Sequence, residues 1–431
     1  AENVFWVPTD ARWNVIADAA HQPNIGVVID NAMTSIEKDN TRLKNVLPKN
    51  YARPELDKIK LGEVVEIFDN VNMHSQGEDF DILGRIYEYC LNQFAAEAKQ
   101  KGGEFYTTAC IVRTLVEVLE PYEGRVYDPA CGSGGMFVQS AKFIQNHRGD
   151  LKKIHIFGQE YNANTWKMAQ MNLAIRGIDA DLGSSWGDSF SDDKHATEKF
   201  DFVMANTPFN MQDWGAERLA NDVRWKYGVP PNGNANFAWI QHMIHHLSPK
   251  GKVGLVLANG SLSSQTGGEG EIRKNLLEAD MVEGIVALPS QLFFSVQIPA
   301  CLWFFNRQKK QQGKVLFVDA RNMGSMVSRT QRELSEEDIL KISDSFKAYQ
   351  VGTLEDEKGF CATVTLEDIA KQDYILTPGR YVGIAETEDD GEPFQEKMER
   401  LTSELSEMFE QSHKLEDEIK KQLATIGFTI K

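Results

Sequence analysis

The chain has 431 residues, of which 42% are hydrophobic and 25% charged, as expected for a globular protein with two or three domains. Its longest apolar runs, Val253–Ala258 and Ile298–Phe305, are far too short to cross a bilayer, and the first residues lack a secretion signal. The net charge of -17 excludes a protein that is basic throughout, so a local patch or a partner would have to contact nucleic acid.

The five cysteines are odd in number, widely scattered and never in a CxxC pair. This usage predicts reduced thiols in a cytoplasmic protein rather than a disulfide framework or a zinc site. The sequence also has no HExxH motif, so we expect no metal centre.

Residues 1–100 are predicted to form a helical N-terminal domain. Apolar residues recur every four positions in a helix expected from Ile82 to Lys99, and Gly102-Gly103 ends the pattern. The chain opens at Ala1 without an initiator methionine, and we expect this domain to be truncated at its start.

Residues 101–385 are predicted to form one α/β domain, because short β-branched runs alternate with helix-like stretches. The expected strands are Arg125–Asp128, Lys153–Phe157, Phe200–Ala205, Lys252–Ala258, Gly284–Leu288, Cys301–Phe305 and Lys314–Asp319. This alternation is typical of a mostly parallel, doubly wound sheet. Ligands bind such sheets beyond the carboxyl ends of the strands, which makes the residues at those ends the first candidates for a site.

Residues 386–431 are predicted to be an acidic linker followed by a long amphipathic helix from about Pro393 to Leu423. A single surface helix must bury its apolar stripe somewhere. It could fold back on its own domain or pack against a partner helix.

A glycine-rich turn follows the first predicted strand, in the run Asp128-Pro129-Ala130-Cys131-Gly132-Ser133-Gly134-Gly135. Glycines allow a tight turn and a close approach of ligand to backbone, and the helix expected from about Met136 would offer free N–H groups to a carboxylate. The spacing matches neither GxGxxG nor GxxxxGK[ST], which disfavours a dinucleotide site or a P-loop.

Two further segments complete a candidate nucleoside site. Glu160, after the second strand, could accept hydrogen bonds from ribose hydroxyls, or it could be a helix cap or a surface acid. In Gly187-Asp188-Ser189-Phe190, Asp188 could receive an adenine amine and Phe190 could stack on the ring, although the segment could also be a plain turn. Upstream, Gly103-Glu104-Phe105-Tyr106-Thr107 could close over the other end of the ligand or serve as a domain linker.

The sequence Asn206-Thr207-Pro208-Phe209 directly follows the strand predicted to end at Ala205. An exocyclic amine on an aromatic base is a poor nucleophile because its lone pair is delocalised. The Asn206 side-chain oxygen and the Thr207 carbonyl could accept its two hydrogens and localise that lone pair. Pro208 fixes the turn and Phe209 offers a face for a flipped-out base. A sulfonium donor needs no strong base or metal, so the pattern favours methyl transfer over a simple Asn-x-Pro turn.

These residues resemble those of the modification subunits of type I restriction-modification systems, a family of N6-adenine DNA methyltransferases. Gly103–Thr108 resembles the family's glycine-phenylalanine-tyrosine-threonine-proline signature, Asp128–Gly135 its cofactor loop, and Glu160 its acidic residue after the second strand. Asn206–Phe209 resembles its Asn-Pro-Pro-Phe catalytic motif. Further similarity lies in residues 233–239 and 257–261 and extends from Glu2–Pro8 to the region of residues 391–394.

The resemblance implies a Rossmann-like class I S-adenosylmethionine-dependent methyltransferase sheet with a helical N-terminal domain and a C-terminal amphipathic helix. It implies S-adenosylmethionine as the cofactor and a flipped adenine in DNA as the substrate. It also implies a specificity subunit that contacts the C-terminal helix, a second modification subunit, and a restriction subunit in the full complex. A separate specificity subunit would explain the acidic charge of this chain.

The chain departs from the family pattern at Thr108 and Thr207, where the family usually has proline. Thr207 keeps a carbonyl acceptor but adds an N–H and frees φ, so we expect reduced rather than absent activity. It leaves open a second interpretation, a subunit that binds cofactor and partner but methylates nothing. A protein-glutamine methyltransferase uses a similar motif, but the chain length and the C-terminal helix argue against it. A nicotinamide dehydrogenase is disfavoured by the glycine spacing.

Overall fold

The computed structural model describes residues 5–70, 86–87, 89–90, 107–147, 149–293, 298–384 and 394–425. Contacts divide the chain into two units, residues 1–384 and 385–431, and each is described by itself. The predicted helix Ile82–Lys99 lies almost wholly outside the described residues. Among the helices that are described, none combines the length and the apolar character needed to cross a membrane.

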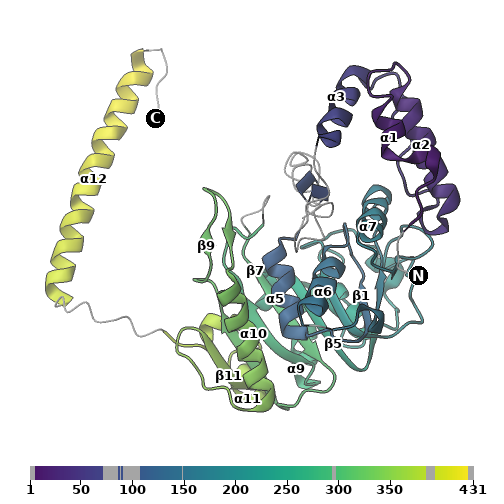
Figure 1. Ribbon diagram of the computed structural model, residues 1–431. Helices are drawn as coiled ribbons and strands as arrows, with labels where there is room; N and C mark the ends of the chain where they lie inside the picture. The colour runs from purple at the N-terminus through teal and green to yellow at the C-terminus, as the bar shows by residue number, and fades with distance from the viewer. Residues whose placement is uncertain are drawn as a thin grey trace. The chain divides into compact units, whose positions relative to one another are not determined.

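Short helices make up the described N-terminal region, as predicted (Figure 1). Their bounds are Thr9–Ala11 (η1), Trp13–Ala17 (α1), Ile25–Asp39 (α2), Thr41–Leu43 (η2) and Lys58–Asp69 (α3). Asp57 caps α3 by accepting hydrogen bonds from the backbone N–H groups of Ile59 and Lys60. A small apolar core that includes Ile25, Ile29 and Val65 holds these helices together.

The centre of the molecule is a nine-stranded sheet with the order β11-β8-β6-β7-β5-β4-β1-β2-β3. The strands are Gly124–Asp128 (β1), Ile154–Gly158 (β2), Ala180–Asp181 (β3), Phe200–Asn206 (β4), Leu247–Ala258 (β5), Val282–Ala287 (β6), Ala300–Asn306 (β7), Lys314–Asp319 (β8) and Cys361–Thr365 (β11). All seven predicted strands are present, with ends that differ by a few residues. Ser325–Met326 (β9) and Arg332–Glu333 (β10) form a separate two-stranded sheet.

Most neighbouring strands run parallel, as the sequence predicts. The parallel pairs are β1–β2, β1–β4, β2–β3, β4–β5 and β6–β8. Strand β7 runs antiparallel between β5 and β6, and β11 runs antiparallel beside β8. The connection order reverses at β1, which has β2 on one side and β4 on the other, and this is where a doubly wound sheet forms a ligand crevice.

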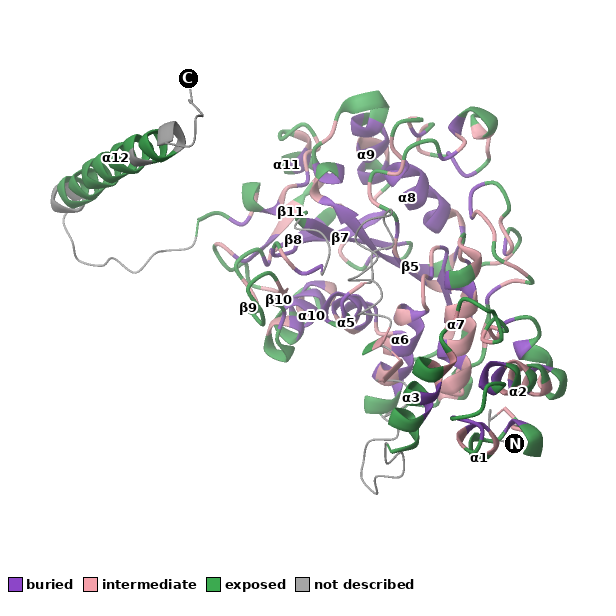
Figure 2. Cartoon of the chain, turned by 90° about the horizontal axis from the view of Figure 1, so that it is seen from above, coloured by how far each residue is buried: buried purple, intermediate pink, exposed green. Residues whose placement is uncertain are grey.

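Helices cover both faces of the sheet and create two cores (Figures 1 and 2). The helices are Ala109–Leu119 (α5), Gly135–Asn146 (α6), Ala163–Ile175 (α7), Asn236–His245 (α8), Glu269–Glu278 (α9), Glu336–Val351 (α10) and Leu366–Ala370 (α11). Successive side chains of β7 point to opposite faces of the sheet and so enter different cores. Leu302 and Phe304 pack in the core under α5, α6 and α10, whereas Trp303 and Phe305 pack in the core under α8 and α9.

The second unit contains one long helix, Phe394–Thr425 (α12), close to the predicted bounds. Its large apolar side chains are exposed, and Figure 2 shows the helix coloured almost entirely as exposed. They are Met398, Leu401, Leu405, Met408, Phe409, Leu415 and Ile419. Residues that recur in this way form one stripe on a helix, and we call these seven residues the α12 stripe.

Close packing between β6 and α10 gives a stability prediction at Gly284. A Cβ atom there would lie 2.6 Å from Phe346 Cε1 and 3.1 Å from the Leu316 carbonyl oxygen, and Phe346 is fully buried. Gly284→Ala should therefore lower the free energy of unfolding by about 1–3 kcal/mol, measured by urea denaturation. Gly260→Ala, where nothing lies within 4 Å of the added Cβ, is the control. Equal stabilities of the two variants would contradict the packing described.

Candidate cofactor and target-base site

Three polar residues from separate strands meet at one edge of the sheet. Asp128 ends β1 and pairs with Gly158 of β2, two residues before Glu160, while Val126 and Tyr127 pair with β4, which ends at Asn206. Because these strands are parallel and adjacent, their carboxyl ends lie side by side. The predicted cofactor turn, the predicted acidic residue and the predicted catalytic motif therefore lie at one edge of the sheet.

The glycine-rich turn leads from β1 into α6 at this edge of the sheet. Gly132 and Gly134 have φ values of 53° and 84°, which favour glycine, and Gly134 is the N-cap of α6. Side chains added at Gly132 or Gly135 would meet nothing within 4 Å. The turn thus leaves open space over the first N–H groups of a twelve-residue helix, a setting that suits an anionic group.

Glu160 and Asp128 shape the same turn. The Glu160 carboxylate accepts hydrogen bonds from the backbone N–H groups of Gly132, at 3.0 Å, and Asn162, at 2.8 Å. Asp128 is 1% exposed and accepts a hydrogen bond from Ala130 N–H at 2.9 Å. Burial raises the pKa of Asp128 well above its usual range, and the Glu160 charge raises it further, while the Ala130 hydrogen bond opposes the shift.

The segment Gly187–Phe190 lies beside the turn. Gly187 N–H donates to the Glu160 carbonyl at 2.9 Å, and the Ser189 hydroxyl donates to the Pro129 carbonyl at 2.5 Å. Asp188 accepts a hydrogen bond from Phe190 N–H at 3.0 Å. Direct hydrogen bonds therefore join three of the four predicted cofactor segments, and the contacts of Asp188 with a cofactor stay a prediction.

Phe190 is more deeply buried than a stacking residue would be. Its ring is 2% exposed and lies with its centroid 4.2 Å from that of Trp239, inside an aromatic cluster that includes Trp214 and Trp225. Little of the ring is available to a bound adenine. The contacts of Phe190 show that its ring anchors the segment that carries Asp188. Stacking of this ring on a cofactor stays a prediction.

The predicted catalytic motif carries two polar atoms that are buried without a partner. Asn206 donates from Nδ2 to the Thr107 hydroxyl at 2.8 Å, but its Oδ1 has no hydrogen-bond partner among the described residues. Thr207 is 1% exposed, and its hydroxyl likewise has no partner within the described part of the chain. Buried polar atoms in folded proteins are nearly always hydrogen-bonded, so these two mark a place where a ligand could bind.

Phe209 is half-buried and meets Phe293 edge to face, with ring centroids 5.8 Å apart. Phe293 is buried and belongs to the apolar core. Pro208 is exposed at the turn. The predicted residues Glu104, Phe105 and Tyr106 lie outside the described residues.

Supporting residues were missed in the sequence. Asn172 on α7 donates to the Ser133 carbonyl at 2.7 Å and so holds the glycine turn from beneath. Asn210, next to the catalytic motif, accepts from Asn236 Nδ2 at 2.9 Å and donates its N–H to Asn236 Oδ1 at 3.0 Å, which ties the motif to the start of α8. Each pairing spans tens of residues, and no local pattern signals it.

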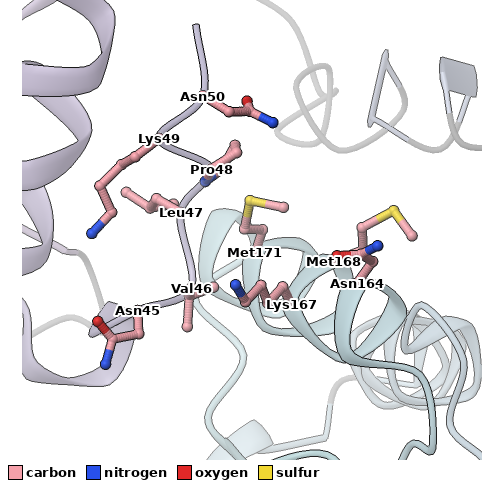
Figure 3. A pocket seen from close by; sticks show the side chains of 10 residues that line it. All are labelled: Asn45, Val46, Leu47, Pro48, Lys49, Asn50, Asn164, Lys167, Met168 and Met171. Atoms are coloured by element: carbon pink, nitrogen blue, oxygen red, sulfur yellow. The ribbon is translucent and has the colours of Figure 1, made fainter. Parts of the chain in front are cut away.

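A pocket of about 510 Å³ lies elsewhere, between residues 45–50 and one side of α7 (Figure 3). Asn164, Lys167, Met168 and Met171 line it from the helix. None of the predicted cofactor or catalytic residues contributes to its wall. It is therefore distinct from the crevice edge that carries Asp128, Glu160 and Asn206.

The sheet order, with an antiparallel β7 and a glycine turn after β1, defines the class I methyltransferase fold. Family models agree: residues 78–390 match the N-6 DNA Methylase domain, and residues 1–68 match the HsdM N-terminal domain. The chain is 49% identical to the HindI methylase subunit of Haemophilus influenzae, over 98% of this chain and 100% of that protein. It is 41% identical to the MjaIX methylase subunit of Methanocaldococcus jannaschii, over 99% of this chain and 78% of that protein.

The chain therefore belongs to the family of type I restriction enzyme methylase subunits, which confirms the family predicted from sequence. Solved structures confirm the fold. The methyltransferase subunit of a type I system from Streptococcus thermophilus matches with a TM-score of 0.75 at 24% identity, over 88% of this chain and 81% of that chain. The EcoKI M protein matches with a TM-score of 0.54 at 17% identity, over 98% and 90%.

The buried Asp128 gives a prediction that separates stability from binding. The folded state holds the Asp128 proton more tightly than the unfolded state does, so stability is lost as pH rises from the unfolded pKa of 3.8 through the raised folded value. Asp128→Asn, which still accepts from Ala130, should raise the melting temperature at pH 8, by less at pH 4, and weaken cofactor binding. The exposed Asp181, whose carboxylate accepts from Gly183 N–H, provides the matched control Asp181→Asn. A lower melting temperature for Asp128→Asn than for the wild type at pH 8 would contradict a raised pKa of Asp128 in the folded state.

Proposed function

We propose that this chain transfers a methyl group from S-adenosylmethionine to N6 of adenine in DNA, as the modification subunit of a type I restriction-modification complex. The observation that carries the proposal is the buried Asn206 Oδ1, which has no partner among the described residues and lies at the tip of β4. An acceptor in this position is what a weakly nucleophilic exocyclic amine requires.

Asn206 would act by accepting one hydrogen of the target amine, while the Thr207 carbonyl accepts the other. Together they draw the nitrogen toward tetrahedral geometry and return its lone pair from the ring. Asn206 Nδ2 donates to the Thr107 hydroxyl, and Oδ1 is the amide atom that has no partner among the described residues. Phe209 would support the flipped base by contact with one face of its ring.

Asp128, Glu160 and Asp188 would hold the cofactor along the crevice edge. The buried Asp128, with its raised pKa, suits a ligand that brings a positive charge, such as the ammonium of the methionine moiety. The open backbone above α6 suits the carboxylate of that moiety. Glu160 would accept from the ribose hydroxyls and Asp188 from the adenine amine. When bound, S-adenosylmethionine supplies a methyl group already activated by its sulfonium.

We infer that DNA recognition depends on a specificity subunit. The net charge of -17 argues that this chain does not supply most of the phosphate contacts. The α12 stripe is an exposed apolar surface that suits a partner helix. Relatives of this chain are named as subunits of type I restriction enzymes. A second modification subunit and, for cleavage, a restriction subunit would complete the assembly.

A second candidate function is a subunit that binds the cofactor without methylating. The observation that favours it is Thr207, which stands where the family usually has proline and whose buried hydroxyl has no partner among the described residues. The same experiment tests both candidates.

Transfer of tritium from labelled S-adenosylmethionine to DNA tests the proposal, with and without the cognate specificity subunit. We expect label on adenine N6 only with the partner present. We also expect Asn206→Ala to lower single-turnover transfer by about a hundredfold or more, as loss of a preorganised hydrogen-bonding group does. The exposed Asn221 supplies the control, Asn221→Ala. If calorimetry shows cofactor binding but no label is transferred, the methyltransferase proposal is contradicted and a subunit that binds the cofactor without methylating is favoured.

Replacing Thr207 by proline tests the departure from the family motif. Proline would fix φ in the loop and remove an N–H, so we expect a two- to fivefold faster single turnover, which corresponds to about 0.4–1 kcal/mol of preorganisation. Thr207→Ser, which restores no rigidity, is the control. An unchanged rate in Thr207→Pro would show that this loop does not need proline's restraint.

A further inference from the structure

Arg224 lies behind the segment Ser189–Phe190 and outside the predicted site. It belongs to the stretch that leads from the catalytic motif to α8, and it is 7% exposed. A buried arginine is costly unless its charge is paired and its donors are used. Its partners therefore show what this side chain holds in place.

The Arg224 guanidinium uses its whole set of donors. Nε and Nη2 bind the Asp222 carboxylate at 2.8 and 2.7 Å, which neutralises the charge. Nη1 donates to the Ser189 carbonyl at 3.1 Å and to His242 Nδ1 at 3.0 Å, and Nη2 donates to the Phe190 carbonyl at 2.6 Å. A planar fork with five fixed donors can hold two successive carbonyls at once, which a lysine cannot do.

His242 is the support on the α8 side. Arginine can only donate, so His242 Nδ1 must accept and the ring proton must sit on Nε2. Burial lowers the pKa of His242 well below its usual value, and the neighbouring His246 lowers it further, which keeps the ring neutral and able to accept.

The same hydrogen bonds argue against a metal centre. Asp193, His242 and His246 offer possible ligand atoms within 4.8 Å of one another. However, the Nδ1 lone pair of His242 is taken by Arg224 and its Nε2 carries the proton, so this histidine has no lone pair left for a metal. His246 instead bridges the Glu198 carbonyl, at 3.1 Å, and the Asp193 carboxylate, at 2.9 Å. The group is a hydrogen-bonded support beneath the cofactor segment.

We propose that Arg224 is a positioning residue that sets the affinity of the crevice for the adenosine half of the cofactor. It donates hydrogen bonds to the carbonyls of Ser189 and Phe190, while the Ser189 hydroxyl binds the Pro129 carbonyl of the glycine-rich turn. The Asp188 carboxylate is thereby held at the crevice edge. The inference rests on the proposed function, which places the cofactor's adenine at Asp188. Arg224 itself touches neither cofactor nor base.

The test compares Arg224→Lys with wild type in the complete methyltransferase complex with its specificity subunit and DNA. We expect KM for S-adenosylmethionine and Kd for adenosine to rise together by about tenfold, as loss of a charge-assisted hydrogen bond predicts. We expect kcat at saturating cofactor to change by less than about twofold, because the Asn206 contacts remain. Arg218→Lys, at an exposed arginine of the same stretch, should change none of these values.

Asp222→Asn is the second variant if Arg224→Lys fails to fold. This variant keeps Arg224 but weakens its pairing with residue 222. We expect KM for S-adenosylmethionine and Kd for adenosine to rise together again, by less than in Arg224→Lys. A fall in kcat with unchanged KM in the variant that folds would overturn the inference, as would unchanged adenosine binding. Failure of the wild-type complex to bind S-adenosylmethionine or adenosine would instead contradict the proposed function.

Discussion

The arrangement depends on one constraint, the position of β1 between β2 and β4 in a parallel register. Hydrogen bonds between these strands fix their carboxyl ends at one edge, so Asp128, Glu160 and Asn206 become neighbours although up to 78 residues separate them. Everything else at the crevice adds to this. The glycine turn opens the backbone above α6, the Ser189 hydroxyl binds the Pro129 carbonyl, and Arg224 holds the Ser189–Phe190 segment from the far side. The apolar cores on the two faces of the sheet hold the strands that carry these groups.

The crevice keeps polar groups in states that a fold selected only for stability would avoid. A buried carboxyl with a raised pKa at Asp128 and a buried acceptor at Asn206 that lacks a partner among the described residues each cost free energy. Under the proposed function, a ligand's positive charge at Asp128 and an amine hydrogen at Asn206 would offset these costs. The membership of the chain in the type I methylase subunit family agrees with this chemistry. The acidic charge and the exposed α12 stripe fit a subunit that shares its work with partners.

The sequence predicted the features that are local in the chain. Short β-branched runs located the seven strands, and glycine, acid and Asn-x-Pro signals located the strand ends, because turn chemistry depends on a few adjacent residues. Contacts between distant residues were not predictable in this way. The antiparallel β7, the burial of Phe190 among tryptophans, the Asn210–Asn236 pair and the Arg224 clamp all arise from tertiary packing. Arg224 stands between the exposed Val223 and the buried Trp225, and nothing in this local pattern indicates that its guanidinium contacts Ser189 and Phe190.

The central claim is that Asn206 Oδ1 accepts a hydrogen bond from the exocyclic amine of a target adenine. The most direct measurement is the structure of the complex with its specificity subunit, a cofactor analogue that cannot transfer a methyl group, and DNA containing the target site. The account predicts that Oδ1 lies about 2.9 Å from N6 of a flipped adenine, a normal hydrogen-bond distance, with the Asn206 amide still bound to Thr107. An adenine that remains stacked in the duplex, or an Oδ1 that binds a protein group instead, would contradict it.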